Sequence, residues 1–191
     1  MDPHTPMHDV YDGYGWREIR AGLERRPGGP WGVEDIDAHN TCQRFVSEEC
    51  GLVVQNNMDW FQSVKNGNHS TGALYGAVLN NPRSIRYLRE ETFLFITFPG
   101  PDEPTLPQLN NVLKPYVKDF LKLEKGHGDV VPHAPAPKPV KATVDHHVSD
   151  IPASRKTSGL ASCTSKLFMC PADETPFYML VDPDGFDPTS A

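Results

Sequence analysis

The sequence predicts an α/β fold whose elements follow the order β-β-β-α-β, flanked by irregular N- and C-terminal extensions. Two observations predict the fold class. A run of β-branched and aromatic residues at 92–98 is typical of a strand, and an apolar stripe over 105–124 has the spacing of an amphipathic helix. Three further apolar runs, at 51–58, 72–79 and 140–149, supply the remaining strands. The chain of 191 residues is long enough for one domain with ragged ends.

The N-terminal residues 1–40 are expected to be irregular because they are rich in Gly, Pro and Asp. A short helix is predicted over 15–26, where Trp16, Ile19 and Leu23 recur at helical spacing. The first part of the core is expected over residues 41–125.

Within this first part, the run at 51–58 predicts a strand that Asp59 closes. The run at 72–79 contains small residues and leaves strand and helix open. A short helix is expected over 83–90. Thr105 is expected to cap the long helix, and Pro115 to kink or restart it.

The second part of the chain begins with a proline-rich stretch at 126–139, which is predicted to be an extended linker. The core is expected to continue over 140–170. After Asp150 the sequence becomes loop-like, and residues 171–191 are expected to form a tail without core character.

The composition restricts the classes of function. The net charge of −7 argues against a chain that binds DNA mainly through a basic surface of its own. No apolar run reaches the ~20 residues that a membrane helix needs, so no membrane role is expected. The N-terminus lacks the pattern of a secretion signal. The four cysteines form no C-x-x-C pair and are expected to be reduced and either buried or idle, with a zinc site as the alternative.

Two aspartates are the candidate catalytic residues. Asp59 and Asp150 each follow a predicted strand, and carboxylates on neighbouring strands can share Mg²⁺ ions that cleave or join a phosphodiester. The element order between them is that of an RNase H-like nuclease core. An alternative stays open, because an aspartate beside a turn often caps the turn or a helix start, and Asp150 before Ile151-Pro152 suits that role. His146 and His147 are adjacent on a predicted strand and point to opposite faces, which argues against a shared metal.

Several short stretches in a fixed order carry a family resemblance. They are Asp12-Gly13, Trp16-Arg17, Asn57-Met58-Asp59-Trp60-Phe61-Gln62, Gly67-Asn68-His69-Ser70-Thr71-Gly72-Ala73, Asn80-Asn81-Pro82-Arg83-Ser84-Ile85-Arg86-Tyr87-Leu88, Phe98-Pro99-Gly100-Pro101, Glu103-Pro104-Thr105, Ser149-Asp150-Ile151-Pro152-Ala153-Ser154-Arg155-Lys156, Ser158-Gly159-Leu160 and Met169-Cys170-Pro171. On these residues the chain resembles the transposases of CACTA (En/Spm-type) DNA transposons, in the form abundant in mushroom-type fungi.

The resemblance implies an incomplete RNase H-like core that depends on Mg²⁺ and acts on transposon-end DNA in the nucleus. Asp59 falls at the first catalytic and metal-binding position and Asp150 at the second, with Arg155 or Lys156 as phosphate contacts. No small-molecule substrate is implied.

The chain also departs from the family pattern. The usual C-P-x-C pair reads Cys170-Pro171-Ala172-Asp173, and residues 128–141 match poorly. The third carboxylate is expected beyond residue 188, so the chain is expected to be an inactive fragment. The alternative is a non-catalytic interaction module that binds full-length transposase or DNA.

Overall fold

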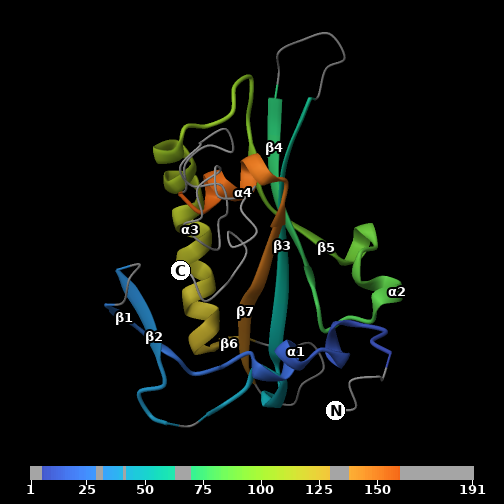
Figure 1. Ribbon diagram of the computed structural model, residues 1–191, viewed down its shortest axis with the longest axis vertical. Helices are drawn as coiled ribbons and strands as arrows, with labels where there is room; N and C mark the ends of the chain where they lie inside the picture. The colour runs from blue at the N-terminus through green and yellow to red at the C-terminus, as the bar shows by residue number, and fades with distance from the viewer. Residues whose placement is uncertain (1–5, 29–31, 41, 63–69, 130–137, 160–191) are drawn as a thin grey trace, which may run out of the picture. The chain divides into compact units, whose positions relative to one another are not determined.

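The computed structural model describes residues 6–28, 32–40, 42–62, 70–129 and 138–159 (Figure 1). The predicted α/β class is confirmed. A five-stranded sheet has the order β5-β4-β3-β7-β6, and a separate two-stranded sheet pairs β1 with β2. The strands of the larger sheet are β3 (Gly51–Gln62), β4 (Ser70–Val78), β5 (Thr92–Phe98), β6 (His127–Asp129) and β7 (Lys138–Ser149). None of the described helices is long and apolar enough to cross a membrane.

The chain divides into two compact units. The first unit comprises Met1–Asn56, Gly76–Phe93 and Pro115–His146. The second comprises Asn57–Tyr75, Leu94–Lys114 and His147–Ala191. Strands β3, β4, β5 and β7 and helix α3 (Leu106–Lys125) each contribute residues to both units, so neither unit is one continuous piece of sequence.

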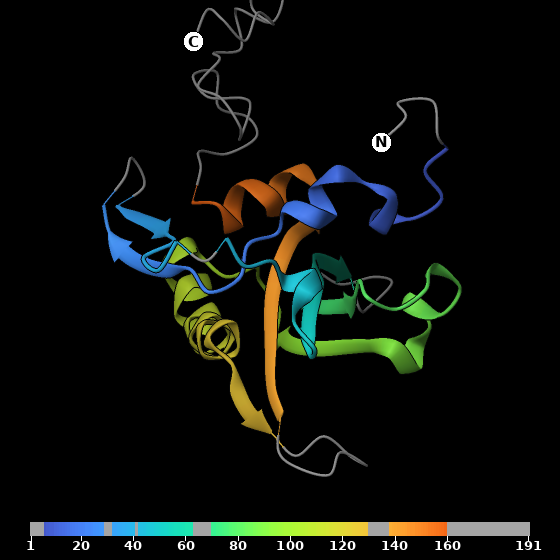
Figure 2. The same cartoon turned by 90° about the horizontal axis from the view of Figure 1, so that it is seen from below.

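The N-terminal part of the first unit is more regular than its composition indicated. It holds the 3-10 turn η1 (Val10–Asp12), helix α1 (Tyr14–Glu18) and the antiparallel strands β1 (Glu24–Pro27) and β2 (Val33–Ile36), which Figure 2 shows as a hairpin. Arg25 pairs with Asp35 across this hairpin through two hydrogen bonds, of 2.8 and 2.7 Å. The expected helix over 15–26 is therefore wrong beyond Glu18. The chain leaves the helix because the N–H of Ala21 donates to the carbonyl of Gln43.

The core of the first unit gathers side chains from distant parts of the sequence. Val53 near the start of β3 and Leu79 directly after β4 supply two of these side chains. The backbone N–H of Leu79 donates to the carbonyl of Val53 at 2.7 Å and holds the two together. The turn η2 (Phe45–Ser47) supplies a third. The buried members are Ala21, Phe45, Val53 and Leu79, with Val10, Trp16 and Ile19 packed against them.

Helix α3 joins this unit through a buried polar contact. Asn56 of β3, 4% exposed, donates its amide Nδ2–H to the hydroxyl of Tyr116 at 2.6 Å. Burial raises the pKa of Tyr116 to about 12, although the hydrogen bond from Asn56 acts in the opposite direction. Pro115 lies inside α3, which continues as one helix, so the predicted restart does not occur.

The structure decides the conformation of the segments at 72–79 and 83–90. The run at 72–79 is strand β4. The expected helix at 83–90 consists of two short pieces, α2 (Arg83–Arg86) and the 3-10 turn η3 (Arg89–Glu91).

At the start of α3, Gln108 accepts hydrogen bonds from the backbone N–H and the hydroxyl of Thr105, each at 2.9 Å.

The stretch at 126–139 is not wholly an extended linker. Strand β6 follows α3 directly and pairs antiparallel with the start of β7, as Figure 2 shows. His127 lies opposite Val140 in this pairing. Gly126 makes the abrupt change from helix to strand possible because it adopts a φ of 90°. Residues 130–137 and the expected tail at 171–191 lie outside the described part of the chain.

Candidate functional site

The first candidate carboxylate, Asp59, lies inside strand β3, and its side chain is exposed. Its neighbours Met58 and Trp60 point to the opposite face because successive strand residues alternate. Met58 is 1% exposed, and Trp60 stacks on Phe98 with ring centroids 5.7 Å apart. The prediction that Asp59 ends the strand is wrong, because β3 continues to Gln62.

The second candidate, Asp150, follows β7 and caps helix α4 (Ile151–Thr157). Its Oδ1 accepts a hydrogen bond from the backbone N–H of Ala153 at 2.8 Å. The cap satisfies one of the N–H groups that a helix start leaves unpaired. The alternative that Asp150 caps a helix is thus confirmed, and the loop expected after it is a helix instead.

The strands that lead to the two aspartates are neighbours. Strands β3 and β7 are adjacent in the sheet although β4, β5 and α3 separate them in the sequence. They run in the same direction in Figure 1. The expected adjacency of two strands far apart in sequence is therefore present, while the catalytic role of Asp59 and Asp150 stays a prediction.

The two predicted phosphate contacts occupy different environments. Arg155 is 1% exposed, so its guanidinium offers almost no surface to a ligand. Lys156 is more accessible, and its Nζ lies 3.1 Å from a carboxylate oxygen of Glu103 and 5.3 Å from the ring centroid of Trp60. Since Lys156 contacts the face of β3 that carries Trp60, it lies on the face away from Asp59.

A magnesium site needs more than these residues supply. Mg²⁺ takes oxygen ligands in near-octahedral geometry and is commonly held by one or two carboxylates with water and substrate phosphate. One carboxylate oxygen of Asp150 already accepts the hydrogen bond that caps α4. Within the described residues, no group of three or more His, Cys, Asp or Glu side chains is placed to hold a metal. The described residues therefore do not form a complete Mg²⁺ site.

The cysteines do not add to this site. Cys42 is exposed and Cys50 is half-buried, and both are free thiols. Cys163 and Cys170 lie outside the described residues.

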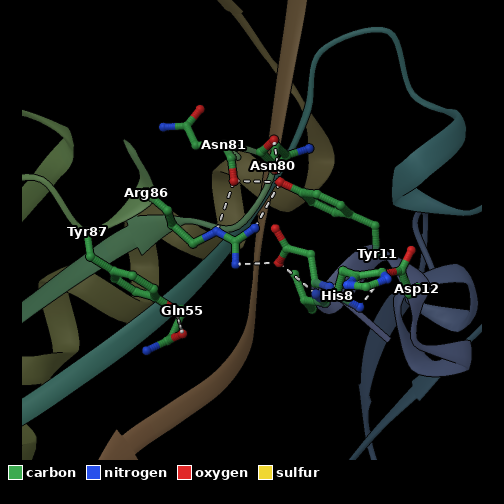
Figure 3. A network of polar contacts seen from close by, with 10 residues as sticks. His8, Tyr11, Asp12, Gln55, Asn80, Asn81, Arg86 and Tyr87 are labelled. Atoms are coloured by element: carbon green, nitrogen blue, oxygen red, sulfur yellow. Dashed lines mark hydrogen bonds and ion pairs between the residues drawn. The ribbon is translucent and has the colours of Figure 1, made fainter. Parts of the chain in front are cut away.

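A second polar site, in the first unit, centres on Arg86 (Figure 3). Its side chain is only 4% exposed, and its NH1 lies 2.8 Å from Asp9 Oδ1. Its Nε–H donates to the carbonyl of Asn81 at 2.9 Å, and an NH2 hydrogen donates to the Tyr11 hydroxyl at 2.8 Å. Tyr11 in turn donates to the Asn81 carbonyl at 2.5 Å. We call these four residues the Arg86 network.

Within the Arg86 network, Arg86 and Asp9 each stabilise the charged form of the other. Burial disfavours the charged form of Arg86, but hydrogen bonds to Asp9 and Tyr11 offset this and raise its pKa. The hydrogen bond from Arg86 is the main reason that the pKa of Asp9 is lowered. Asp9 also begins η1 in a reciprocal capping box with Asp12. The network therefore fixes the N-terminal segment to the turn before α2.

Sequence reasoning missed this network. In the sequence, Arg86 was noted as part of the stretch at 80–88 that carries the family resemblance. One signal was available, since Asp9 and Asp12 have the spacing of a capping box. No pattern in one sequence shows that Asp9 and Arg86 meet, because their contact is long-range. A scan against protein-family models and a search of curated proteins both find no match.

Proposed function

We propose that this chain carries the first part of an RNase H-like core of the CACTA transposase type and does not cleave DNA by itself. The observation that carries the proposal is the adjacency of β3 and β7. An RNase H-like core needs this adjacency to bring its first two carboxylates together. Asp59 lies on the first of these strands and Asp150 directly follows the second.

The lack of cleavage follows from what the two aspartates offer. Two-metal phosphodiester chemistry requires ions about 3.5–4 Å apart that clamp the attacking and leaving oxygens. Asp59 is exposed and Asp150 is partly used as a helix cap. Within the described residues no third acidic side chain joins them to form a cluster. Such a pair binds Mg²⁺ weakly and does not fix the geometry of a phosphate.

A nicking assay tests the inactivity. Purified chain is incubated with supercoiled plasmid and either Mg²⁺ or Mn²⁺, and the relaxed product is followed by gel electrophoresis. We expect no nicking above that of the Asp59→Asn variant, which keeps the size of the side chain and removes its charge. Metal-dependent nicking that Asp59→Asn abolishes would overturn the proposed inactivity. The lineage is tested separately by sequencing the genomic locus, where flanking terminal inverted repeats are expected; their absence counts against it.

A second candidate function is a non-catalytic interaction module that binds a protein partner, including full-length transposase. The net charge of −7 favours this over binding to DNA, whose phosphates repel an acidic surface. Fluorescence anisotropy with labelled duplex DNA measures the distinction. Salt-sensitive DNA binding near physiological ionic strength contradicts the preference for a protein partner.

A further inference from the structure

An open hollow lies beside the Arg86 network in the first unit. Its volume is about 700 Å³, within the range of about 300–1,000 Å³ that is usual for small-molecule sites. The lining comes from three parts of the sequence, at 7–16, 83–87 and 145–146. Two of these parts, the N-terminal segment and α2, are joined by the ion pair between Asp9 and Arg86, so these walls are fixed in place.

The hollow is lined by charged groups of both signs, and Arg83 is the one that can receive an anion. Asp9 pairs with Arg86 at 2.8 Å. Asp145 lies 2.7 Å from His146 Nδ1, a contact that is an ion pair only when the imidazole is protonated. Arg83 also lines the hollow, and its guanidinium forms no ion pair with any residue that the structure describes. An Arg guanidinium presents several N–H donors in a plane that matches phosphate and carboxylate oxygens. Among the described residues that line the hollow, Arg83 is therefore the cation available to a bound anion.

Two aromatic rings give the hollow a preference for a planar group. Trp16 lines it and is held edge-to-face against Tyr11, with ring centroids 5.4 Å apart. Tyr87 also lines it, is 56% exposed, and has its hydroxyl anchored to Gln55 at 3.1 Å (Figure 3). Aromatic side chains that are held in place offer a ring face on which a nucleobase can stack.

Gly15 lines the hollow in the N-terminal segment. A Cβ placed on Gly15 meets no other atom within 4 Å, and Gly15 does not adopt a left-handed backbone conformation. A larger side chain at this position is therefore accommodated by the fold and occupies space at the hollow. Gly15 thus offers a way to block the site without disturbing the Arg86 network.

We propose that this hollow binds a free mononucleotide, with the phosphate at Arg83 and the base against Trp16 or Tyr87. The proposal is independent of the transposase lineage, because it uses residues of the first unit only and none of the acidic residues discussed for cleavage. Its ligand class follows from one unpaired guanidinium, two positioned rings and a volume of about 700 Å³.

Isothermal titration calorimetry of the full chain with AMP tests the proposal, with adenosine and inorganic phosphate as partial ligands. We expect AMP to bind more tightly than either partial ligand. Arg83→Gln is expected to weaken AMP binding about tenfold, since a charge-assisted contact to phosphate is lost. Arg89→Gln is the matched control, because Arg89 is exposed, does not line the hollow and carries the same charge. It is expected to change binding less than twofold.

A blocking variant gives an independent readout. Gly15→Leu is expected to abolish AMP binding while circular dichroism and the unfolding midpoint stay near those of the parent chain. The proposal is overturned if AMP does not bind at millimolar concentration to folded protein, or if Arg83→Gln and Arg89→Gln have equal effects. It is also overturned if adenosine binds as tightly as AMP, or if only a single-stranded oligonucleotide binds.

Discussion

Replacing Arg86 with methionine removes the central group of the Arg86 network while keeping much of its apolar volume. Arg86 is 4% exposed at its side chain and joins Asp9, Tyr11 and the carbonyl of Asn81. Removing one partner of a buried ion pair typically costs about 3–5 kcal/mol. The remaining groups keep some partners here, since Asp9 still accepts from the N–H of Val10, and Tyr11 and the Asn81 carbonyl still bond to each other. We therefore expect a loss near the lower limit, about 3 kcal/mol.

Urea unfolding followed by circular dichroism and tryptophan fluorescence measures this loss. Arg89→Met serves as the control, because Arg89 is exposed and its replacement is expected to change stability by less than about 0.5 kcal/mol. The double variant Arg86→Met/Asp9→Asn tests whether the loss comes from the ion pair with Asp9 or from the packing of the Arg86 side chain. If the ion pair is the source, Asp9→Asn costs little in the Arg86→Met background. A loss below about 1 kcal/mol for Arg86→Met, or strict additivity of the two changes, would refute the reasoning.

Substitutions at three other positions, Tyr116, Gly72 and Asp150, each test a local contact. Tyr116→Phe leaves the buried amide of Asn56 without its acceptor and is expected to cost about 1–3 kcal/mol in urea unfolding. Because the folded pKa of Tyr116 is raised to about 12, the parent chain is also expected to lose stability as pH rises from 10 towards 12, and a parallel loss in Tyr116→Phe contradicts this assignment. Gly72→Ala is expected to cost about 1–3 kcal/mol, since its Cβ falls 2.9 Å from Nε1 of Trp60, and an unchanged melting temperature rules that out. Asp150→Ala is expected to cost about 1 kcal/mol and Asp150→Asn almost nothing, because Asn also caps; equal losses count against the cap.

Periodicity predicted the elements whose own residues determine them. Strand β5 matches the expected 92–98, and α3 differs from the expected 105–124 by one residue at each end. Both have an uninterrupted apolar pattern, so local sequence was sufficient. Helix α4 was missed because it has only seven residues, and its start depends on the side chain of Asp150 and not on an apolar stripe.

The candidate sites could be predicted only in part, because they depend on individual polar contacts that an apolar pattern does not reveal. The aspartates were found because each lies beside an apolar run, but the use of Asp150 as a cap depends on one hydrogen bond. The strands β1 and β2 were missed because they are short and largely polar, and their pairing is supported by Arg25 and Asp35. The Arg86 network was missed because Arg86 is charged yet buried, and burial of a charge depends on partners distant in sequence.

Strand β5 has a consequence for the behaviour of the protein at high concentration. Among the described strands it forms an edge of the larger sheet, and its seven residues include neither a charge nor a proline. Edge strands usually carry such residues because they prevent intermolecular strand pairing, whereas Leu94 of β5 is 64% exposed. Repulsion between molecules of net charge −7 then becomes the main protection against self-association. Salt screens that repulsion over about 10 Å at 0.1 M, so the solubility of this protein should fall as ionic strength rises.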